Sequence, residues 1–203
     1  MNFTNKNEMM KRSTEKAIHY FSQPGKENTQ KTLELAVGRA SLLQLKAILV
    51  STKSGETALR LTEAAQASHY DGRIIAVTYH QGFFNNQSST ISEDVQKLLS
   101  EKNISIVMSS HALSGVSRSF REKYGGISIP EIIAESFRRI SQGFKVAVEI
   151  TIMAADAGAV PSDQDVVAIG GQSQGADTAL VLRPAHQNSF FDLKIKEVIC
   201  FPS

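Results

Sequence analysis

The fold of this 203-residue chain is decided by the stretch AILVSTKSGETALRLTEAAQASHYDGRIIAVTYHQGF, residues 47–83. It opens with an apolar strand at 47–50, passes through a short hydroxyl-rich connection, and continues as a helix whose apolar residues recur at helical spacing over 58–65. A second strand at 74–77 is apolar at every position, which is typical of a strand buried on both faces of a parallel sheet. The stretch therefore predicts a strand–helix–strand unit.

The same alternation continues along the chain. We expect further strands at 17–21, 104–108, 166–169, 178–182 and 193–201, and helices at 29–43, 92–102 and 131–141. The segment 145–157 suits an apolar helix or a strand, since Val146, Val148, Ile150 and Ile152 alternate, and the run at 154–158 favours a buried helix. Residues 110–128 have no clear period and are expected to form either a long functional loop or a short helix with a loop. Strands and helices that alternate with short connections predict a doubly wound α/β sheet with helices on both faces. We expect 1–15 to be a polar leader and 16–203 a single domain.

Composition narrows the classes of function. Lys and Arg together number 22 against 20 Asp and Glu, and the absence of a basic stripe argues against a nucleic-acid partner. No apolar stretch approaches the ~20 residues that cross a membrane, and the N-terminus has no apolar signal segment. The single cysteine, Cys200, is expected to be a core thiol, and the histidines lack the spacing of metal ligands. A cytoplasmic location is the resulting expectation.

The connection 51–57 has the chemistry of an anion site. The first N–H groups of a helix lack intrahelical partners and lie at the positive end of the helix dipole. Gly55 allows a close backbone approach, and several hydroxyl groups and one cation accompany it. The candidate ligand residues are Ser51, Thr52, Lys53, Ser54, Gly55, Glu56 and Thr57. A phosphate monoester is the expected ligand, although a tight strand-to-helix turn with an N-cap accounts for the same residue types.

Other candidates follow neighbouring strands. His80 and His111 each come directly after a predicted strand, so both are expected at the sheet edge that carries the 51–57 loop. Either histidine could hydrogen-bond a ligand or act as an acid or base near neutral pH, and either could instead cap a turn. Arg118 either faces the ligand phosphate or solvates a loop. Glu149 lies in an apolar segment and is expected to need a salt-bridge partner.

The stretch 47–83 resembles the C-terminal domain of pyruvate kinases, in which a strand, a hydroxyl-rich Ser-Gly loop and a helix precede a strand ending in Ala-Val-Thr. The tail, 165–202, is similar to the closing strands of that domain. Nearly the whole chain is identified as a member of a family of stand-alone proteins of this type, mostly archaeal and bacterial. The motifs that carry the resemblance are PGKENT at 24–29, SGETALRL at 54–61, SHALSGV at 110–116, SQGFKVAVEITIMAADAG at 141–158 and GADTALVLRPAH at 175–186.

This resemblance implies a three-layer α/β/α sandwich with a mostly parallel sheet and flavin mononucleotide (FMN) as the associated ligand. It does not extend to the catalytic barrel of the kinases, so it implies no kinase activity. The ligand residues that it carries over are those of the 51–57 loop. Thr78, His80, His111, Ser114, Gly115 and Gly171 complete the predicted cofactor-binding set. The tail loop 170–177 departs from the kinases, because it lacks the Trp or basic residue that often meets a second phosphate. A ligand with one phosphate and a large ring agrees with that departure.

The core Ser54-Gly55-Glu56-Thr57 also resembles the phosphate loop of sugar isomerase domains, over about a dozen residues. Two classes of function therefore stay open. One is a binding or regulatory module for FMN or another phosphorylated metabolite. The other is an enzyme, either a flavin-dependent oxidoreductase or a phosphosugar isomerase that uses His80, His111 or Glu149. The expected partner is a small phosphorylated molecule, and association with further copies of the chain is left open.

Overall fold

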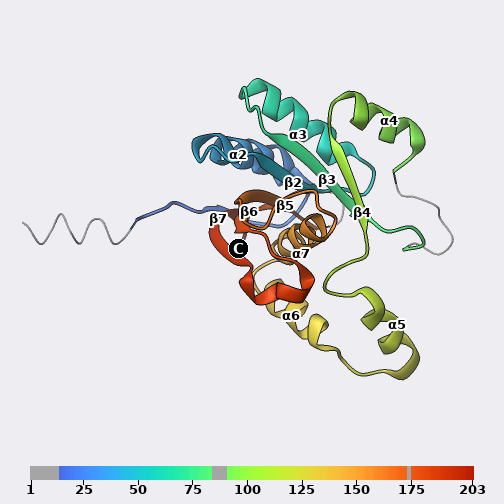
Figure 1. Cartoon of the computed structure of the whole chain (residues 1–203). Helices are drawn as coiled ribbons and strands as arrows, with labels where there is room; N and C mark the ends of the chain where they lie inside the picture. Colours follow the sequence, from blue (N-terminus) through green and yellow to red (C-terminus); the bar gives the residue numbers. More distant parts are fainter. Residues whose placement is uncertain (1–13, 84–90, 173–174) are drawn as a thin grey trace, which may run out of the picture.

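A seven-stranded sheet forms the centre of the computed structural model, which describes residues 14–83, 91–172 and 175–203 (Figure 1). The strand order is β1-β7-β6-β5-β2-β3-β4. The strands are β1 (His19–Phe21), β2 (Ala47–Ser51), β3 (Arg73–Tyr79), β4 (Ser105–Ser109), β5 (Val166–Gly170), β6 (Thr178–Arg183) and β7 (Lys194–Pro202). Only β6 runs antiparallel to its neighbours, so the prediction of a mostly parallel sheet is confirmed.

Helices cover both faces of the sheet and complete three layers (Figure 1). One face carries α2 (Thr29–Leu42), α3 (Glu56–Ala67) and α4 (Glu93–Glu101), and the other carries α7 (Gln142–Asp156) with α6 (Ile129–Arg138) packed outside it. Helix α5 (Gly115–Tyr124) extends away from the sheet, and two 3-10 turns, η1 (Lys26–Asn28) and η2 (Gln187–Asp192), complete the described elements. The α/β/α sandwich expected from the sequence is therefore confirmed.

Helix α7 is the central buried helix. Its alternating Val146, Val148, Ile150 and Ile152 would also suit a strand, but the Ser141 hydroxyl accepts the Phe144 N–H at 2.9 Å and begins a helix there. Nearly every side chain of α7 is buried against β2, β5 and β6. The helix predicted at 145–157 thus exists and begins three residues earlier.

The segment before α7 shows which of two alternatives holds. Residues 110–128 contain helix α5, so the short helix with a loop is correct. The helix predicted at 131–141 lies instead at Ile129–Arg138. It begins earlier because the Glu131 carboxylate accepts both the N–H and the hydroxyl of Ser128, each at 3.0 Å. It ends earlier because Ser141 caps the next helix.

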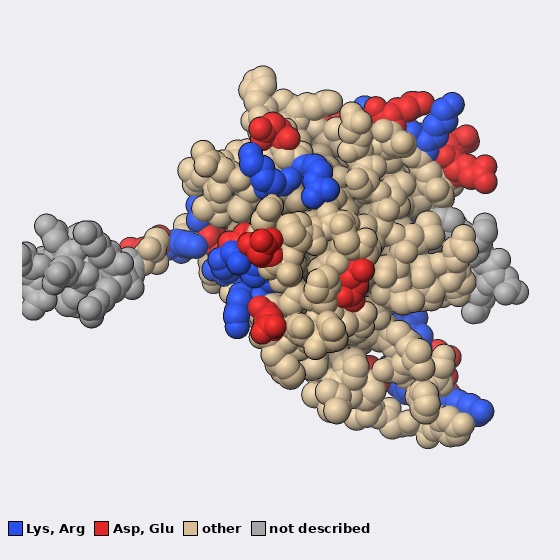
Figure 2. Space-filling view, in the orientation of Figure 1, with Lys and Arg blue, Asp and Glu red and all other residues tan. Residues whose placement is uncertain are grey.

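Several whole-chain expectations can be compared with the described residues. Cys200 is fully buried on β7, and burial raises the pKa of its thiol to about 11, as expected for a core thiol. Among the described residues no helix is long and apolar enough to cross a bilayer, and no group of three metal-ligating side chains occurs. Lys and Arg are interspersed with Asp and Glu over the face seen in Figure 2. Residues 1–13 of the expected leader lie outside the described part.

Candidate functional site

A cavity of about 490 Å³ opens at the carboxyl ends of β2 and β3, between the loop after β2 and helix α7. Its volume falls within the ~300–1,000 Å³ typical of small-molecule sites. The lining residues that matter chemically are Ser51, Thr52, Lys53, Ser54, Glu56, Thr57, Thr78, Tyr79, His111, Gln142, Glu149, Gly171 and Gly175, together with the apolar Val77, Val146, Ile150 and Met153. This edge of an open α/β sheet is where ligands bind in such folds.

The loop after β2 is fixed by two hydrogen bonds of Thr52. Its N–H donates to the Val77 carbonyl at 3.0 Å, which ties the loop to β3. Its hydroxyl accepts the Gly55 N–H at 3.0 Å, which closes the loop on itself. Gly55 then serves as the N-cap of α3, with its carbonyl accepting the Leu59 N–H at 3.1 Å. The free end of α3 is therefore held at the cavity rim.

Six of the seven predicted loop residues line the cavity, and Gly55 does not. Its φ of +92° lies in the left-handed region that favours glycine. A Cβ added to Gly55 would lie 2.5 Å from Val95 Cγ1 on α4. The close approach that the sequence suggested toward a ligand is thus an approach toward α4, and Gly55 acts by shaping the loop.

Few formal charges surround the cavity. The lining carries one lysine, Lys53, against two glutamates, Glu56 and Glu149. Glu56 occupies the first turn of α3, where a carboxylate stabilises the helix dipole. Attraction for an anion must therefore come from Lys53, the hydroxyl groups and the N–H groups of the helix end. Such a set of donors suits one phosphate better than two.

Four aromatic rings cluster where β3 and β4 end: Tyr79, His80, Phe83 and His111. The His111 ring lies 4.7 Å from Phe83, 5.3 Å from Tyr79 and 6.0 Å from His80, measured between ring centroids. As expected, both histidines reach the sheet edge of the loop, but His111 lines the cavity and His80 lies behind it. Within the described part of the chain, Nδ1 of each histidine is buried without a hydrogen-bond partner.

Burial controls the protonation of this cluster. Desolvation lowers the pKa of His111 to about 4, and the nearby Glu149 carboxylate opposes that shift only in part. Burial also raises the pKa of Tyr79, and the charge of Glu149 adds to the effect. At neutral pH, His111 is therefore an uncharged imidazole, which offers a hydrogen bond and no positive charge.

Glu149 has the partner that its apolar setting required. It forms an ion pair with Lys145, one helical turn earlier on α7, with side chains only 3% and 7% exposed. Its Oε1 also accepts the Leu113 N–H at 3.0 Å, which ties α7 to the segment that leads into α5. Burial lowers the pKa of Lys145, and the carboxylate of Glu149 works against that shift.

The remaining predicted residues do not all line the same cavity. Thr78 and Gly171 line the cavity with the loop. Ser114 and Arg118 instead line a second cavity, of about 210 Å³, between α5, α6 and α7. Gly115 begins α5 and lines neither cavity. In the tail loop, residues 173–174 lie outside the described part of the chain.

Of the wall that α7 contributes, sequence reasoning identified only Glu149. Gln142, Val146, Glu149, Ile150 and Met153 recur at three- and four-residue intervals, so they share one face of the helix and line the cavity together. That spacing was visible in the sequence. It could not identify the cavity face, because α7 is apolar on nearly every side.

The family model described as pyruvate kinase, alpha/beta domain, matches residues 30–182, about three quarters of the chain. Among solved structures, the chain is similar to Cryptosporidium parvum pyruvate kinase in complex with ADP, at 14% identity and a TM-score of 0.37. That alignment covers 89% of this chain and 26% of the kinase, so the chain spans about a quarter of the kinase's length. On the match of the family model, the chain belongs to the pyruvate kinase alpha/beta domain family.

Proposed function

We propose that the 490 Å³ cavity binds a small phosphorylated molecule, FMN, with its phosphate at the 51–57 loop. One observation carries the proposal: a hydroxyl-lined helix N-terminus and two rings of the aromatic cluster, Tyr79 and His111, line the same cavity. The first feature suits a phosphate and the second suits a flat ring system. The apolar side of α7 joins the two ends.

At the phosphate end, the loop supplies donors that need no rearrangement. Thr52 holds the loop to β3 and to Gly55, so the first turn of α3 keeps its orientation toward the cavity. The hydroxyl groups of Ser54 and Thr57 and the ammonium group of Lys53 line that end. Hydrogen bonds to a charged phosphate oxygen are about twice as strong as neutral ones.

At the ring end, apolar side chains of α7 and two aromatic rings line the cavity, together with the polar side chains of Gln142 and Glu149. Val146, Ile150 and Met153 form an apolar wall opposite the rings of Tyr79 and His111. Bound FMN would supply a redox-active ring, whereas the residues of this chain would bind and orient it.

A titration of the purified full chain with FMN, followed by flavin fluorescence, tests the proposal. Riboflavin, which lacks the phosphate, serves as the matched ligand. The double variant Ser54→Ala/Thr57→Val should weaken FMN binding at least ~10-fold, because hydrogen bonds to charged groups are lost, and leave riboflavin unchanged. Ser68→Ala, at the far end of α3, is the control variant and should bind FMN as the wild type does.

Three outcomes would contradict the proposal. The first is no binding of FMN. The second is equal loss of FMN and riboflavin in the double variant, because that loss could not come from the phosphate. The third is mass spectrometry that finds a non-phosphorylated molecule co-purifying in the cavity.

A second candidate function is phosphosugar isomerisation, which the juxtaposition of Glu149 and the uncharged His111 favours. Both line the cavity beside the loop, as an acid and a base for proton transfer would. Incubation of hexose 6-phosphates with the protein in D₂O, followed by proton NMR, would detect exchange at the carbon next to the carbonyl. Exchange that His111→Gln abolishes would support the isomerase, and its absence would leave binding alone.

A further inference from the structure

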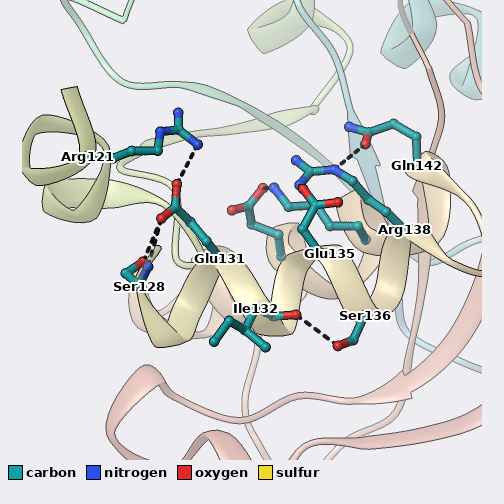
Figure 3. Close-up of polar contacts among 10 residues, drawn as sticks. Arg121, Ser128, Glu131, Ile132, Glu135, Ser136, Arg138 and Gln142 are labelled. Atoms are coloured by element: carbon teal, nitrogen blue, oxygen red, sulfur yellow. Dashed lines mark hydrogen bonds and ion pairs between the residues drawn. The ribbon is translucent and has the colours of Figure 1, made fainter. Parts of the chain in front are cut away.

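The 210 Å³ cavity between α5, α6 and α7 gathers cationic side chains (Figure 3). Arg118 and Arg121 come from α5, Arg138 from the end of α6, and Lys145 from α7. The carboxylates that line it are Glu131 and Glu135, both on α6. Three helices thus direct positive charge into one small space.

Three of these cations already have carboxylate partners. Arg121 Nη1 lies 2.6 Å from Glu131 Oε1, as Figure 3 shows. Arg138 Nη1 lies 2.5 Å from Glu135 Oε1, and its Nε donates to Gln142 Oε1 at 2.8 Å (Figure 3). Lys145 pairs with Glu149 behind the cavity. These contacts hold the three cations in place.

Arg118 is the exception. It forms no ion pair within the described ranges, and its guanidinium lies 4.5 Å from the centroid of the Phe83 ring. A guanidinium stacked on a ring keeps its N–H groups free at its edge. The four cations of the lining outnumber the carboxylates that pair with them by one, so one positive charge is in excess. Arg118 carries that charge. Burial lowers the pKa of Lys145, and the hydrogen bond from the Ser128 N–H lowers the pKa of Glu131; the charge of Arg118 adds to both shifts.

The beginning of α5 faces the same space. Leu113 and Ser114 line the cavity, and Ser114 occupies the N-cap position without a side-chain capping hydrogen bond. The Gly115 N–H donates to the His111 carbonyl at 3.0 Å and the Arg118 N–H to the Ser114 carbonyl at 3.1 Å, so the amides of Val116 and Ser117 are the donors that this ten-residue helix offers at its end. A hydroxyl, a helix end and an unpaired guanidinium therefore converge there.

We infer that this cavity is a second anion site, which binds a small oxyanion through Arg118 and Ser114. The group it would take is a phosphate or a carboxylate, because the planar fork of arginine matches both. Its volume lies below the ~300 Å³ at which sites for larger ligands begin, so the ligand is an inorganic ion or a compound of a few heavy atoms.

The site is separate from the 51–57 loop and does not depend on the function proposed for it. Lys145 lines the small cavity and Glu149 the large one, so the ion pair between them forms the shared wall. An anion beside Arg118 and a phosphate at Lys53 would occupy different cavities. Each of the two anion-binding sites can therefore be removed by substitution without removing the other.

NMR of the ¹⁵N-labelled full chain tests the inference. Inorganic phosphate and oxalate are titrated separately, with chloride holding the ionic strength constant. We expect one or both ions to shift the amides of residues 116–118 and the Nε–H of Arg118, in the wild type and in Ser54→Ala/Thr57→Val alike. Arg118→Gln should weaken this response at least ~10-fold. Arg139→Gln, which removes an exposed charge next to Arg138 but lines neither cavity, should leave it unchanged.

The outcomes separate the two sites. Shifts at α5 that persist without any response of the 56–58 amides would support the anion site while contradicting the phosphate loop. The ion that binds with the higher affinity would identify the group that the site prefers. No shift at α5 with either ion would overturn the inference, as would an equal weakening by Arg118→Gln and Arg139→Gln, since that would reflect diffuse charge. Arg118→Lys, which keeps the charge and loses the fork, should bind with intermediate affinity.

Discussion

Lys145 and Glu149 form a buried ion pair whose two members line different cavities. Lys145 belongs to the small, arginine-lined cavity, and Glu149 belongs to the large one beside the 51–57 loop. Because Glu149 also accepts the Leu113 N–H, the pair fixes the segment leading into α5 as well as the wall. The geometry of both candidate sites thus depends on one turn of α7.

Removal of one member of this pair should destabilise the protein strongly. Lys145→Met would leave the Glu149 carboxylate buried without its partner, and such losses cost about 3–5 kcal/mol. The free energy of unfolding in urea at pH 7 measures the effect. Lys145→Met/Glu149→Gln should recover part of the loss, because the amide oxygen can still accept the Leu113 N–H. Glu135→Gln, which breaks a more exposed ion pair, should cost under ~1 kcal/mol, and a similar cost for Lys145→Met would contradict the prediction.

His111 should make stability depend on pH below neutrality. In the folded chain its pKa of about 4 lies below the ordinary value of 6.5. Between these two pH values the unfolded chain therefore binds a proton at His111 and the folded chain does not. The stabilisation is complete above pH 6.5 and is lost as the pH falls toward 4. For a side chain that is partly exposed we expect a contribution of about 2 kcal/mol.

Urea unfolding of the wild type and of His111→Gln is measured at several pH values between 7 and 4. The other ionisable groups are the same in both proteins, so the difference between their free energies of unfolding isolates this contribution. The two curves should converge as the pH falls. A proton NMR titration that gives His111 a pKa near 6.5 would refute the prediction directly.

Glu56→Gln should strengthen phosphate binding. Glu56 lines the cavity in the first turn of α3, where its charge opposes an anion. We expect FMN to bind about 3-fold more tightly in the variant, at a cost of a few tenths of a kcal/mol in stability, because the favourable interaction with the helix dipole is lost. Glu63→Gln, two turns along the same helix and exposed, is the control. Weaker binding in Glu56→Gln would mean that the carboxylate accepts a ligand hydroxyl and that the phosphate lies elsewhere.

Gly55→Ala should destabilise the loop through α4. The φ of +92° and the 2.5 Å approach of Val95 Cγ1 to the added methyl group both oppose the change, and we expect a loss of about 2 kcal/mol or more. Thermal unfolding measures it. Gly55→Ala/Val95→Ala should lose less than the sum of the single variants, because the contact is relieved. Strict additivity would show that backbone strain alone is responsible.

Local signals in the sequence were sufficient for the strand–helix–strand unit at 47–77. For α7 they allowed a helix or a strand and favoured the buried helix that the structure has. Consecutive apolar residues and helical spacing report burial directly, so the boundaries agree to within a few residues. The loop 51–57 was recognisable because its chemistry is contiguous in the chain. Those features need no knowledge of distant contacts.

The features that could not be predicted from the sequence depend on packing between residues far apart in the chain. Gly55 turns toward α4 because Val95 packs there, some forty residues away in the chain. Arg118 and Ser114 belong to the second cavity because α5 leaves the sheet, a direction that no periodicity encodes. The cavity face of α7 is set by which strands it covers, since its own sequence is apolar nearly all round.

Cys200 gives this fold an internal reporter. It is the only cysteine in the chain, and it is fully buried on β7, where its thiol has a pKa of about 11. Alkylating reagents attack the thiolate, so the folded chain should resist them at pH 8, and modification should follow the rate at which the sheet opens. A ligand that binds only the folded state slows that opening by a factor of 1 + [L]/Kd. Ligand binding in either cavity can therefore be followed by the rate at which this native thiol is alkylated, without a dye or an engineered label.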